Sequence, residues 1–359
     1  MTLYRHLRTA AVAGLLSILA PTVAGTAAPA AATKDSDNGP ATVLQRIMVH
    51  GRSLEGNLMG ESADRETFVI LPPSYASHPR RRYPVVYMLH GYSYDSNRWV
   101  HDDDIAESAR VDFAKGAREV ILVLPNASNA YDGSMYSNSA TIGNFEDFIA
   151  YDLPHYIDSH YRTIANRASR GLAGHSMGGY GAARIGMRHP DMFGALYIMS
   201  PCCMSPRDAG PIDPENEAKL AAIRTPADAS TLPRMLKAQL AVAAAWSPNP
   251  ANPPLYLDLP AKDGAVRPDV LAKWAANAPL AFVDQYIGNL KQYRAIAIDV
   301  GDKDGLKADT VKLHTILDSY HVAHSFELYD GDHTNRVRTR LHDLVIPFFS
   351  RSLAFPSQR

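Results

Sequence analysis

A serine between two glycines is the first residue of this sequence whose setting suggests chemistry. Residues 171–181 read GLAGHSMGGYG, and the five residues from Gly174 to Gly178 fit the pattern G-x-S-x-G around Ser176. A serine hydroxyl becomes a strong nucleophile when a nearby base removes its proton. Glycines on both sides permit the tight strand-to-helix turn that exposes such a serine. A pattern with three defined positions also arises by chance, so its meaning depends on residues elsewhere in the chain.

A base and an orienting acid must follow Ser176 along the chain if this turn is a nucleophile elbow. Residues 295–306 read AIAIDVGDKDGL, an apolar strand followed by a loop that holds Asp302 and Asp304. We predict Asp304 as the acid and keep Asp302 as the alternative, because an aspartate in a glycine-containing loop often caps a turn instead. His333 stands in the sequence GDHT after the next predicted strand and is the predicted base.

Two backbone N–H groups are needed to stabilise the negative charge that develops on an attacked carbonyl oxygen. One is expected from Met177, the residue after the nucleophile. The other is expected from Tyr92, because the apolar strand 84–89 ends in the sequence HGY, whose glycine lets the backbone approach a substrate. His175 adjoins Ser176 but is predicted to point away from the site.

Short apolar runs alternate with longer amphipathic segments along most of the chain. Several runs, such as VVYML, VILVL and AIAIDV, are largely apolar throughout, which is typical of strands buried on both faces of a parallel sheet. We therefore predict an α/β fold with a mostly parallel central sheet and helices on both faces. The predicted strands are residues 43–49, 66–71, 84–89, 119–124, 171–174, 195–200, 295–300 and 325–329. The predicted helices are residues 104–114, 144–159, 177–188, 306–320 and 336–350.

One region departs from this alternation. Residues 203–290 contain many prolines and two alanine-rich helical stretches, residues 233–245 and 269–276, but no clear strand. We interpret this region as an insertion that forms a cap before the acid-bearing strand, because a segment of this kind has a thin core of its own. The prediction is a single domain over residues 41–352, with residues 353–359 as a C-terminal tail.

The N-terminus has the composition of an export signal. Positively charged residues precede the apolar run 11–20, and a small-residue stretch that contains APA follows it. This order matches the three parts of a secretory signal peptide, and the run is short for a bilayer span. Residues 1–30 are therefore predicted as a signal peptide and residues 31–40 as a linker, which implies a secreted or periplasmic protein.

The composition excludes several classes of function. The net charge is -1, from 36 basic and 37 acidic residues, so neither nucleic acid nor a membrane is an expected partner of the mature chain. The run HDDD at residues 101–104 could hold a hard cation, but we favour a solvated helix start, and no metal site is predicted. The only cysteines, Cys202 and Cys203, are adjacent and are interpreted as thiols at a strand end.

The segments YPVVYMLHGY, GHSMGGYGA, GDKDG and GDHT together resemble the α/β-hydrolase family of secreted esterases, in particular the esterase D-like group. This group includes feruloyl and acetyl-xylan esterases, S-formylglutathione hydrolases and mycobacterial mycolyltransferases. The resemblance extends from about residue 65 to residue 349, apart from the insertion. It implies the α/β-hydrolase fold and hydrolysis of carboxylic esters by a Ser176–His333–Asp304 triad, through an acyl-enzyme intermediate and without a metal or organic cofactor.

The expected substrate is a small-molecule or carbohydrate-linked ester. Tyr94, Trp99 and Tyr136 lie in loops near the predicted site and are candidates for stacking on a sugar or phenolic group, although loop packing uses the same residue types. The insertion, with Trp246 and Trp274, is expected to shape the substrate pocket. An acyltransferase or a serine peptidase would use the same triad, and both stay as alternatives. A binding module without activity would not need all three triad positions.

Overall fold

The computed structural model describes residues 41–206 and 213–356, and eight strands from these residues form one sheet. The predicted signal peptide and linker, residues 1–40, lie outside the described residues, as do residues 357–359 of the predicted tail. The strands of this sheet are β1 (Val43–His50), β2 (Asp64–Leu71), β3 (Val85–Leu89), β4 (Ile121–Pro125), β7 (Arg170–His175), β8 (Ala195–Met199), β11 (Ala295–Gly301) and β12 (Ser325–Tyr329). Each corresponds to a predicted strand.

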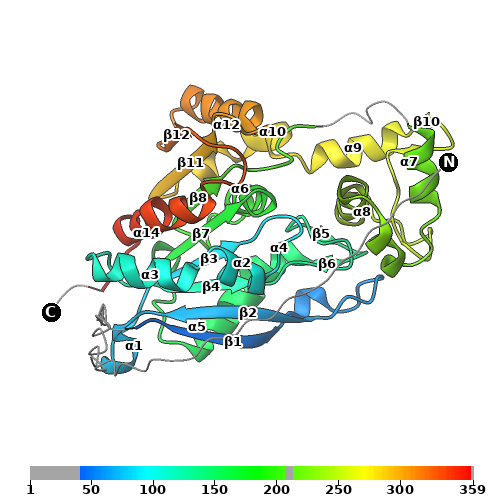
Figure 1. The fold of residues 1–359 in the computed structure, drawn as a ribbon. Coiled ribbons are helices and arrows are strands. Elements are labelled where there is room, and N and C mark those ends of the chain that lie inside the picture. The colour runs from blue at the N-terminus through cyan, green and yellow to red at the C-terminus, as the bar shows by residue number, and fades with distance from the viewer. Residues whose placement is uncertain (1–40, 207–212, 357–359) are drawn as a thin grey trace, which may run out of the picture. The chain divides into compact units, whose positions relative to one another are not determined.

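The sheet is mixed but mostly parallel. Its strand order is β1-β2-β4-β3-β7-β8-β11-β12 (Figure 1). The two pairings β1–β2 and β2–β4 are antiparallel, and the five others are parallel. The predicted α/β architecture is therefore confirmed.

Alternate residues of the central strands point into two separate hydrophobic clusters. On β3, Val85, Tyr87 and Leu89 belong to the first cluster, whereas Val86 and Met88 belong to the second. All five side chains are buried, because helices cover both faces of the sheet. This double burial is the physical reason for the uninterrupted apolar run in the sequence.

Helices from different parts of the chain pack on the two faces (Figure 1). The first cluster includes residues of α5 (Leu153–His160), α6 (Met177–Arg188) and α12 (Lys307–Ser319). The second includes residues of α2 (Ser96–Asp102), α3 (Ile105–Ala114) and α14 (Ile346–Ser352). Within the described ranges, none of the helices combines the length and apolar content that a bilayer span requires.

Two predicted helices are interrupted by a wider turn. The helix predicted over residues 144–159 consists of α4 (Phe145–Asp147), a π-helical turn over Phe148–Asp152, and α5. The helix predicted over residues 336–350 consists of α13 (Val337–Arg340), a π-helical turn over Leu341–Val345, and α14. Most apolar residues of both turns are buried, among them Phe148 and Leu341, so the sequence pattern continues although the hydrogen-bond register changes.

The predicted insertion lies between β8 and β11 in the chain and is mainly helical. Its helices are α7 (Pro214–Ala221), α8 (Arg234–Trp246), α9 (Pro268–Ala276), α10 (Pro279–Phe282) and α11 (Ile287–Leu290). A hairpin of β9 (Ala261–Lys262) and β10 (Ala265–Val266) is also present, so the expectation of no strand is wrong here. Strands of two residues are too short to show any alternation. Other short elements are α1 (Ser74–Ser77), β5 (Asn138–Ser139) and β6 (Gly143–Asn144), together with 3-10 turns at Arg52–Leu54, Arg167–Ser169, Pro226–Thr231 and Val283–Tyr286.

The parallel strands determine where the candidate site lies. The loops that follow β3, β7, β11 and β12 leave the sheet at the same edge, because these strands run in one direction. These loops carry, in chain order, the HGY segment, Ser176, Asp304 and His333. Segments far apart in the sequence are thereby brought to one edge of the sheet.

Candidate active site

Ser176 lies on a strained turn between β7 and α6. Its backbone has φ 57° and ψ -113°, a combination that L-residues rarely adopt. An added Cβ on Gly174 would lie 2.2 Å from the carbonyl oxygen of Gly178, and one on Gly178 would lie 1.9 Å from that of Leu89. Neither position accepts a side chain, because the neighbouring atoms belong to the backbone. The strand, the tight turn and the helix expected around the motif are all present.

His333 and Asp304 lie beside Ser176 in the order that proton transfer requires. His333 Nε2 is 2.9 Å from Ser176 Oγ, and His333 Nδ1 is 2.8 Å from Asp304 Oδ2. Asp302, the alternative acid, instead accepts a hydrogen bond from the Gly331 N–H at 3.0 Å. The structure therefore brings Asp304, and not Asp302, against the histidine.

The surroundings of Asp304 keep its carboxylate ionised. Burial favours the neutral acid, but hydrogen bonds from His333 and from the Leu306 N–H outweigh burial, and the pKa of Asp304 lies below its ordinary value. The Asp304 side chain is 1% exposed, whereas the His333 side chain is 33% exposed. A buried carboxylate behind the ring keeps the proton on Nδ1 and leaves the Nε2 lone pair facing Ser176.

The turn that carries His333 is held by two neighbouring aspartates. Asp332 accepts hydrogen bonds from the N–H groups of the two residues that follow His333, at 2.8 and 2.9 Å. Asp330 forms an ion pair with Lys303 on the loop of Asp304. These contacts keep the acid loop and the histidine loop together.

The backbone N–H groups of Tyr92 and Met177 are among those near the nucleophile that have no partner in the described residues. Met177 is the first residue of α6, where a helix leaves its N–H groups unpaired. Gly91 lies beside the elbow, since an added Cβ would be 3.4 Å from Ser176 Cβ. Two available donors at this place are the arrangement that an oxyanion hole needs.

His175 differs from the expectation. Its ring does not point away but lies against His333, with ring centroids 4.8 Å apart and Nε2 2.8 Å from the His333 carbonyl oxygen. Because a carbonyl oxygen only accepts, the Nε2 of His175 carries the proton. Burial and the neighbouring His333 lower the pKa of His175 to about 4, so its ring is neutral at neutral pH. His175 holds the backbone of the candidate base, a role that no spacing in the sequence indicates.

A small cleft opens at these residues. Its volume is about 80 Å³, and Ser176 and His333 line it together with the aromatic residues Tyr92, Tyr94 and Trp99. The predicted substrate contacts Tyr94 and Trp99 thus lie at the cleft, although Trp99 is almost fully buried. The aromatic lining gives one wall of the cleft an apolar surface.

The insertion reaches this cleft through Arg234, the first residue of α8. The Arg234 guanidinium lies 5.8 Å from the centroid of the Tyr92 ring. Trp246 and Trp274 are buried instead, and their indole N–H groups donate to serine hydroxyls inside the protein. The expectation for the insertion is therefore corrected: a charged side chain at the start of a helix, and not the tryptophans, lines the cleft.

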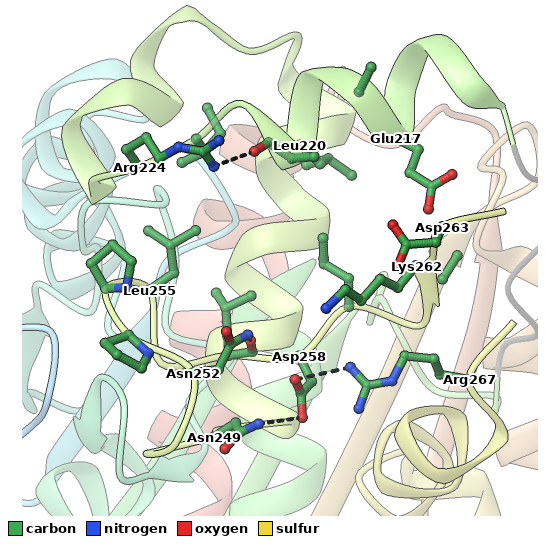
Figure 2. A pocket seen from close by; sticks show the side chains of 18 of the residues that line it. Glu217, Leu220, Arg224, Asn249, Asn252, Leu255, Asp258, Lys262, Asp263 and Arg267 are labelled. Carbon is green, nitrogen blue, oxygen red and sulfur yellow. Dashed lines mark hydrogen bonds and ion pairs between the residues drawn. The ribbon is translucent and has the colours of Figure 1, made fainter. Parts of the chain in front are cut away.

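Two larger cavities lie away from Ser176. One of about 740 Å³ is lined by the insertion, where Asp258 lies between Asn249 and Arg267 (Figure 2). The other, of about 800 Å³, is lined by residues around α5 together with His50. No residue of the Ser176–His333–Asp304 set lines either cavity, so cavity size does not identify the candidate active site.

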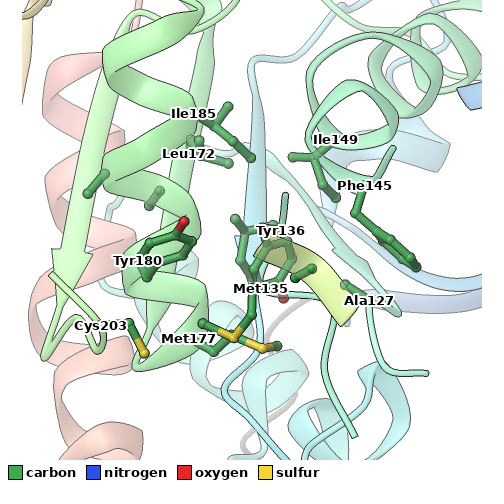
Figure 3. Packing of buried hydrophobic residues seen from close by; sticks show 14 of the residues in the cluster. Ala127, Met135, Tyr136, Phe145, Ile149, Leu172, Met177, Tyr180, Ile185 and Cys203 are labelled. Atoms are coloured by element: carbon green, nitrogen blue, oxygen red, sulfur yellow. The ribbon is translucent and has the colours of Figure 1, made fainter. Parts of the chain in front are cut away.

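Tyr136 does not reach the cleft. It is fully buried, and its hydroxyl donates to the His90 carbonyl oxygen at 3.0 Å. Figure 3 shows Tyr136 in the apolar packing near Met177 and Tyr180 of α6. The prediction of Tyr136 as a substrate contact is wrong, because the local sequence marks an aromatic loop residue without showing which way the loop turns. Through this hydrogen bond, Tyr136 holds the backbone of the HGY loop from the side of the hydrophobic core.

The acidic run at 101–104 lies where α2 meets α3. Asp102 pairs with Arg98 at 3.5 Å, and Asp104 pairs with Arg338 at 2.7 Å. Burial and the neighbouring Asp102 raise the pKa of Asp103 to about 6. Two of the three carboxylates are therefore engaged with arginines.

The two adjacent cysteines lie close to the elbow. The Cys202 N–H donates to the Ser176 carbonyl oxygen at 3.0 Å. The sulfur atoms of Cys202 and Cys203 are 2.8 Å apart. Both residues follow the end of β8, the strand-end position expected from the sequence.

Comparison with known proteins agrees with this architecture. The model of the family described as "Putative esterase" matches residues 60–343. Over 146 residues the chain is 30% identical to Esterase Rv1288 of Mycobacterium tuberculosis, which covers 40% of this chain and 30% of that protein. The chain thus spans under a third of the length of that relative.

Solved structures show the same fold. A ferulic acid esterase matches with a TM-score of 0.63 and 22% identity, over 88% of this chain and all of the other. A ferulic acid esterase from Anaeromyces mucronatus in complex with ferulic acid matches with a TM-score of 0.51 and 19% identity, over 86% of this chain and 92% of the other. The architecture is that of an α/β-hydrolase. The chain belongs to the putative esterase family, whose members are carboxylic ester hydrolases.

The contact between His175 and His333 yields a first prediction. His175→Phe keeps a ring but removes the hydrogen bond to the His333 carbonyl oxygen, so we expect kcat on an aryl ester to fall roughly 3- to 10-fold. KM should change less than about twofold, because the cleft itself is kept. His175→Gln, whose amide nitrogen takes the place of Nε2, should retain most of the activity. A wild-type kcat in His175→Phe would exclude the positioning role.

Proposed function

We propose that this chain is a serine esterase that hydrolyses carboxylic esters through an acyl-enzyme intermediate. Ser176 Oγ attacks the ester carbonyl carbon while His333 Nε2 takes the hydroxyl proton, and Asp304 stabilises the resulting imidazolium. The N–H groups of Tyr92 and Met177 donate to the oxyanion. The proton on His333 then passes to the leaving alcohol as the ester bond breaks. A water molecule, deprotonated by His333, attacks the acyl group and restores the Ser176 hydroxyl.

One observation carries this proposal: the unbroken chain of hydrogen bonds from Ser176 Oγ through His333 to Asp304, at 2.9 and 2.8 Å. A serine hydroxyl is a weak nucleophile alone, and this chain supplies the base that it needs. Membership of an esterase family supports the same reaction class.

The cleft supports a small-molecule or carbohydrate-linked ester as substrate. Pockets that enclose a drug-sized ligand hold about 300–1,000 Å³, and the cleft here holds about 80 Å³. It encloses the reacting ester and a small group, so the rest of the substrate lies along the rim near Tyr94 and Arg234. An aromatic face and a guanidinium suit a phenolic ring or a sugar. The named ferulic acid esterases of the same fold support this class.

We also propose that the protein is exported, with residues 1–30 removed as a signal peptide and residues 31–40 as the linker that then leads into the domain. The order of charged, apolar and small residues at the N-terminus supports this location, secreted or periplasmic. N-terminal sequencing of the protein recovered from culture medium or periplasm should give a mature start near residue 31. A chain recovered there with its first residues intact would contradict cleavage.

Removal of the nucleophile tests the proposed reaction. Ser176→Ala should lower kcat/KM on a simple aryl ester by at least about 10³-fold, because the Ser176 hydroxyl is the one that lies at hydrogen-bond distance from His333 Nε2 among the described residues. A fluorophosphonate probe should label the unmodified protein at Ser176 and should not label the variant. Ser319→Ala, at an exposed position on α12, is the matched control and should behave like the wild type. Activity retained by Ser176→Ala would contradict the proposal, and turnover that requires an added alcohol would indicate acyl transfer.

The pH profile tests the histidine base. kcat/KM should rise with pH on the acid side, because only a neutral imidazole at His333 can take the Ser176 proton. The pKa of Asp304 is lowered, so this carboxylate stays ionised above about pH 4 and adds no second step to the acid limb. The lowered pKa of Asp304 also stabilises the fold at pH values above the pKa that Asp304 has in the unfolded chain. This contribution to the free energy of unfolding is lost as the pH falls through the pKa of Asp304 in the folded protein. A flat rate profile between about pH 5 and about pH 7 would exclude a histidine base.

A further inference from the structure

A second group of chemically active side chains lies away from the cleft. His314 and Asp318 are four residues apart on α12 and therefore share one helix face. His324 directly precedes β12. One ligand atom from each of these three residues lies within 4.8 Å of the others. We propose that His314, Asp318 and His324 bind a zinc-type transition-metal dication, at a site separate from the esterase centre.

The distances fit such an ion with small movements. His314 Nδ1 is 2.8 Å from His324 Nε2, His324 Nε2 is 3.8 Å from Asp318 Oδ1, and His314 Nε2 is 3.4 Å from Asp318 Oδ2. Around a tetrahedral zinc ion with bonds of about 2.0–2.1 Å, ligand atoms are about 3.3 Å apart. With His314 Nδ1 and His324 Nε2 as the nitrogen ligands, these two atoms must move apart by about 0.5 Å, and Asp318 Oδ1 must approach His324 Nε2 by about the same amount. One ligand atom from each of the three residues already lies within 4.8 Å of the others.

The protonation pattern favours a cation at this place. His324 Nδ1 lies 2.8 Å from the Val322 carbonyl oxygen, which only accepts, so Nδ1 carries the proton and Nε2 presents its lone pair to the cluster. His314 Nδ1 lies 2.8 Å from this nitrogen. With the His314 proton on Nε2, directed towards Asp318 Oδ2 at 3.4 Å, the His314 Nδ1 lone pair faces the His324 Nε2 lone pair. Two such lone pairs repel unless a proton or a metal ion lies between them, and a metal ion there binds both nitrogens and can also take a carboxylate oxygen of Asp318.

The rings are held in place before any ion binds. The His324 side chain is 2% exposed, and a backbone carbonyl fixes its orientation. The His314 ring stacks on Phe326 of β12, with centroids 4.2 Å apart and planes 8° from parallel. Asp318 is 62% exposed, so water has access to the remaining coordination position. Two imidazoles and one carboxylate are a donor set for Zn²⁺, Co²⁺ or Ni²⁺, whereas Ca²⁺ and Mg²⁺ prefer oxygen ligands throughout.

The place of this site in the fold points to a structural role. β12 begins after His324, and the loop that carries His333 begins after its other end. An ion here ties α12 to the edge strand of the sheet, at the end of β12 remote from His333. Ion binding should therefore stabilise the fold without entering the ester reaction.

The test uses the full mature chain without an affinity tag, stripped with EDTA and dialysed. Titration with CoCl2 should produce the visible absorption bands of a tetrahedral site, and calorimetry with ZnCl2 near neutral pH should give one ion per chain. Saturating zinc should raise Tm by roughly 3–8 °C. Asp318→Asn and His324→Asn should each weaken zinc binding at least about 10-fold; the asparagine amide at 324 can still donate to the Val322 carbonyl oxygen.

Two control variants separate this site from its neighbours. His321→Gln changes an exposed histidine of the same loop, and His333→Gln removes the histidine of the esterase centre; both should bind zinc as the wild type does. Binding that is lost in His333→Gln and kept in His324→Asn would move the ion to the esterase centre and overturn the proposal. Equal zinc binding by all four variants would overturn the proposal as well. So would the absence of any binding when zinc or cobalt is added to the wild type at about 100-fold excess over micromolar protein.

Discussion

The backbone contact between the first turn of α6 and the end of β3 is the constraint on which the rest of the candidate site depends. Gly178 meets the carbonyl oxygen of Leu89 so closely that no Cβ fits between them. Because the helix starts this close to the sheet, Ser176 takes its strained backbone, and the Met177 N–H stays unpaired next to the HGY loop. A looser contact would let the turn relax and would separate the nucleophile from both candidate N–H donors.

The histidine of the site depends on a second set of contacts, made by the loop after β11 and by the end of β7. Asp304 holds the ring of His333, and His175 holds its carbonyl oxygen. Behind them, Arg340 bridges Asp299 of β11 and Glu327 of β12, at 2.7 Å to each. Burial outweighs the nearby arginine and raises the pKa of Asp299 to about 6. The edge strand that leads to His333 is thus tied to its neighbour by charge as well as by the sheet hydrogen bonds.

Much of the fold could be predicted because its physical cause is local in the sequence. Continuous apolar runs mark strands with helices on both faces, and glycines at fixed spacing mark the elbow. The errors share another cause. The sequence predicts Tyr136, Trp246 and Trp274 at the cleft, but all three side chains are buried, whereas Arg234 lines the cleft. An aromatic residue can pack in the core or line a binding cleft, and its type in the sequence is the same in both cases. The packing of the folded chain decides which of the two surroundings it has.

The α/β class, the succession of strands and helices along the chain, and the succession of HGY, Ser176, an acid loop and His333 could be read from the sequence, because periodicity and chain order depend on residues that are neighbours in the chain. Folding in three dimensions decides which aspartate meets His333 and that His175 turns towards the site. It also decides that His314, Asp318 and His324 converge. Each of these outcomes depends on distances between segments that are remote in the chain, and those distances exist only once the parallel strands have brought their ends together.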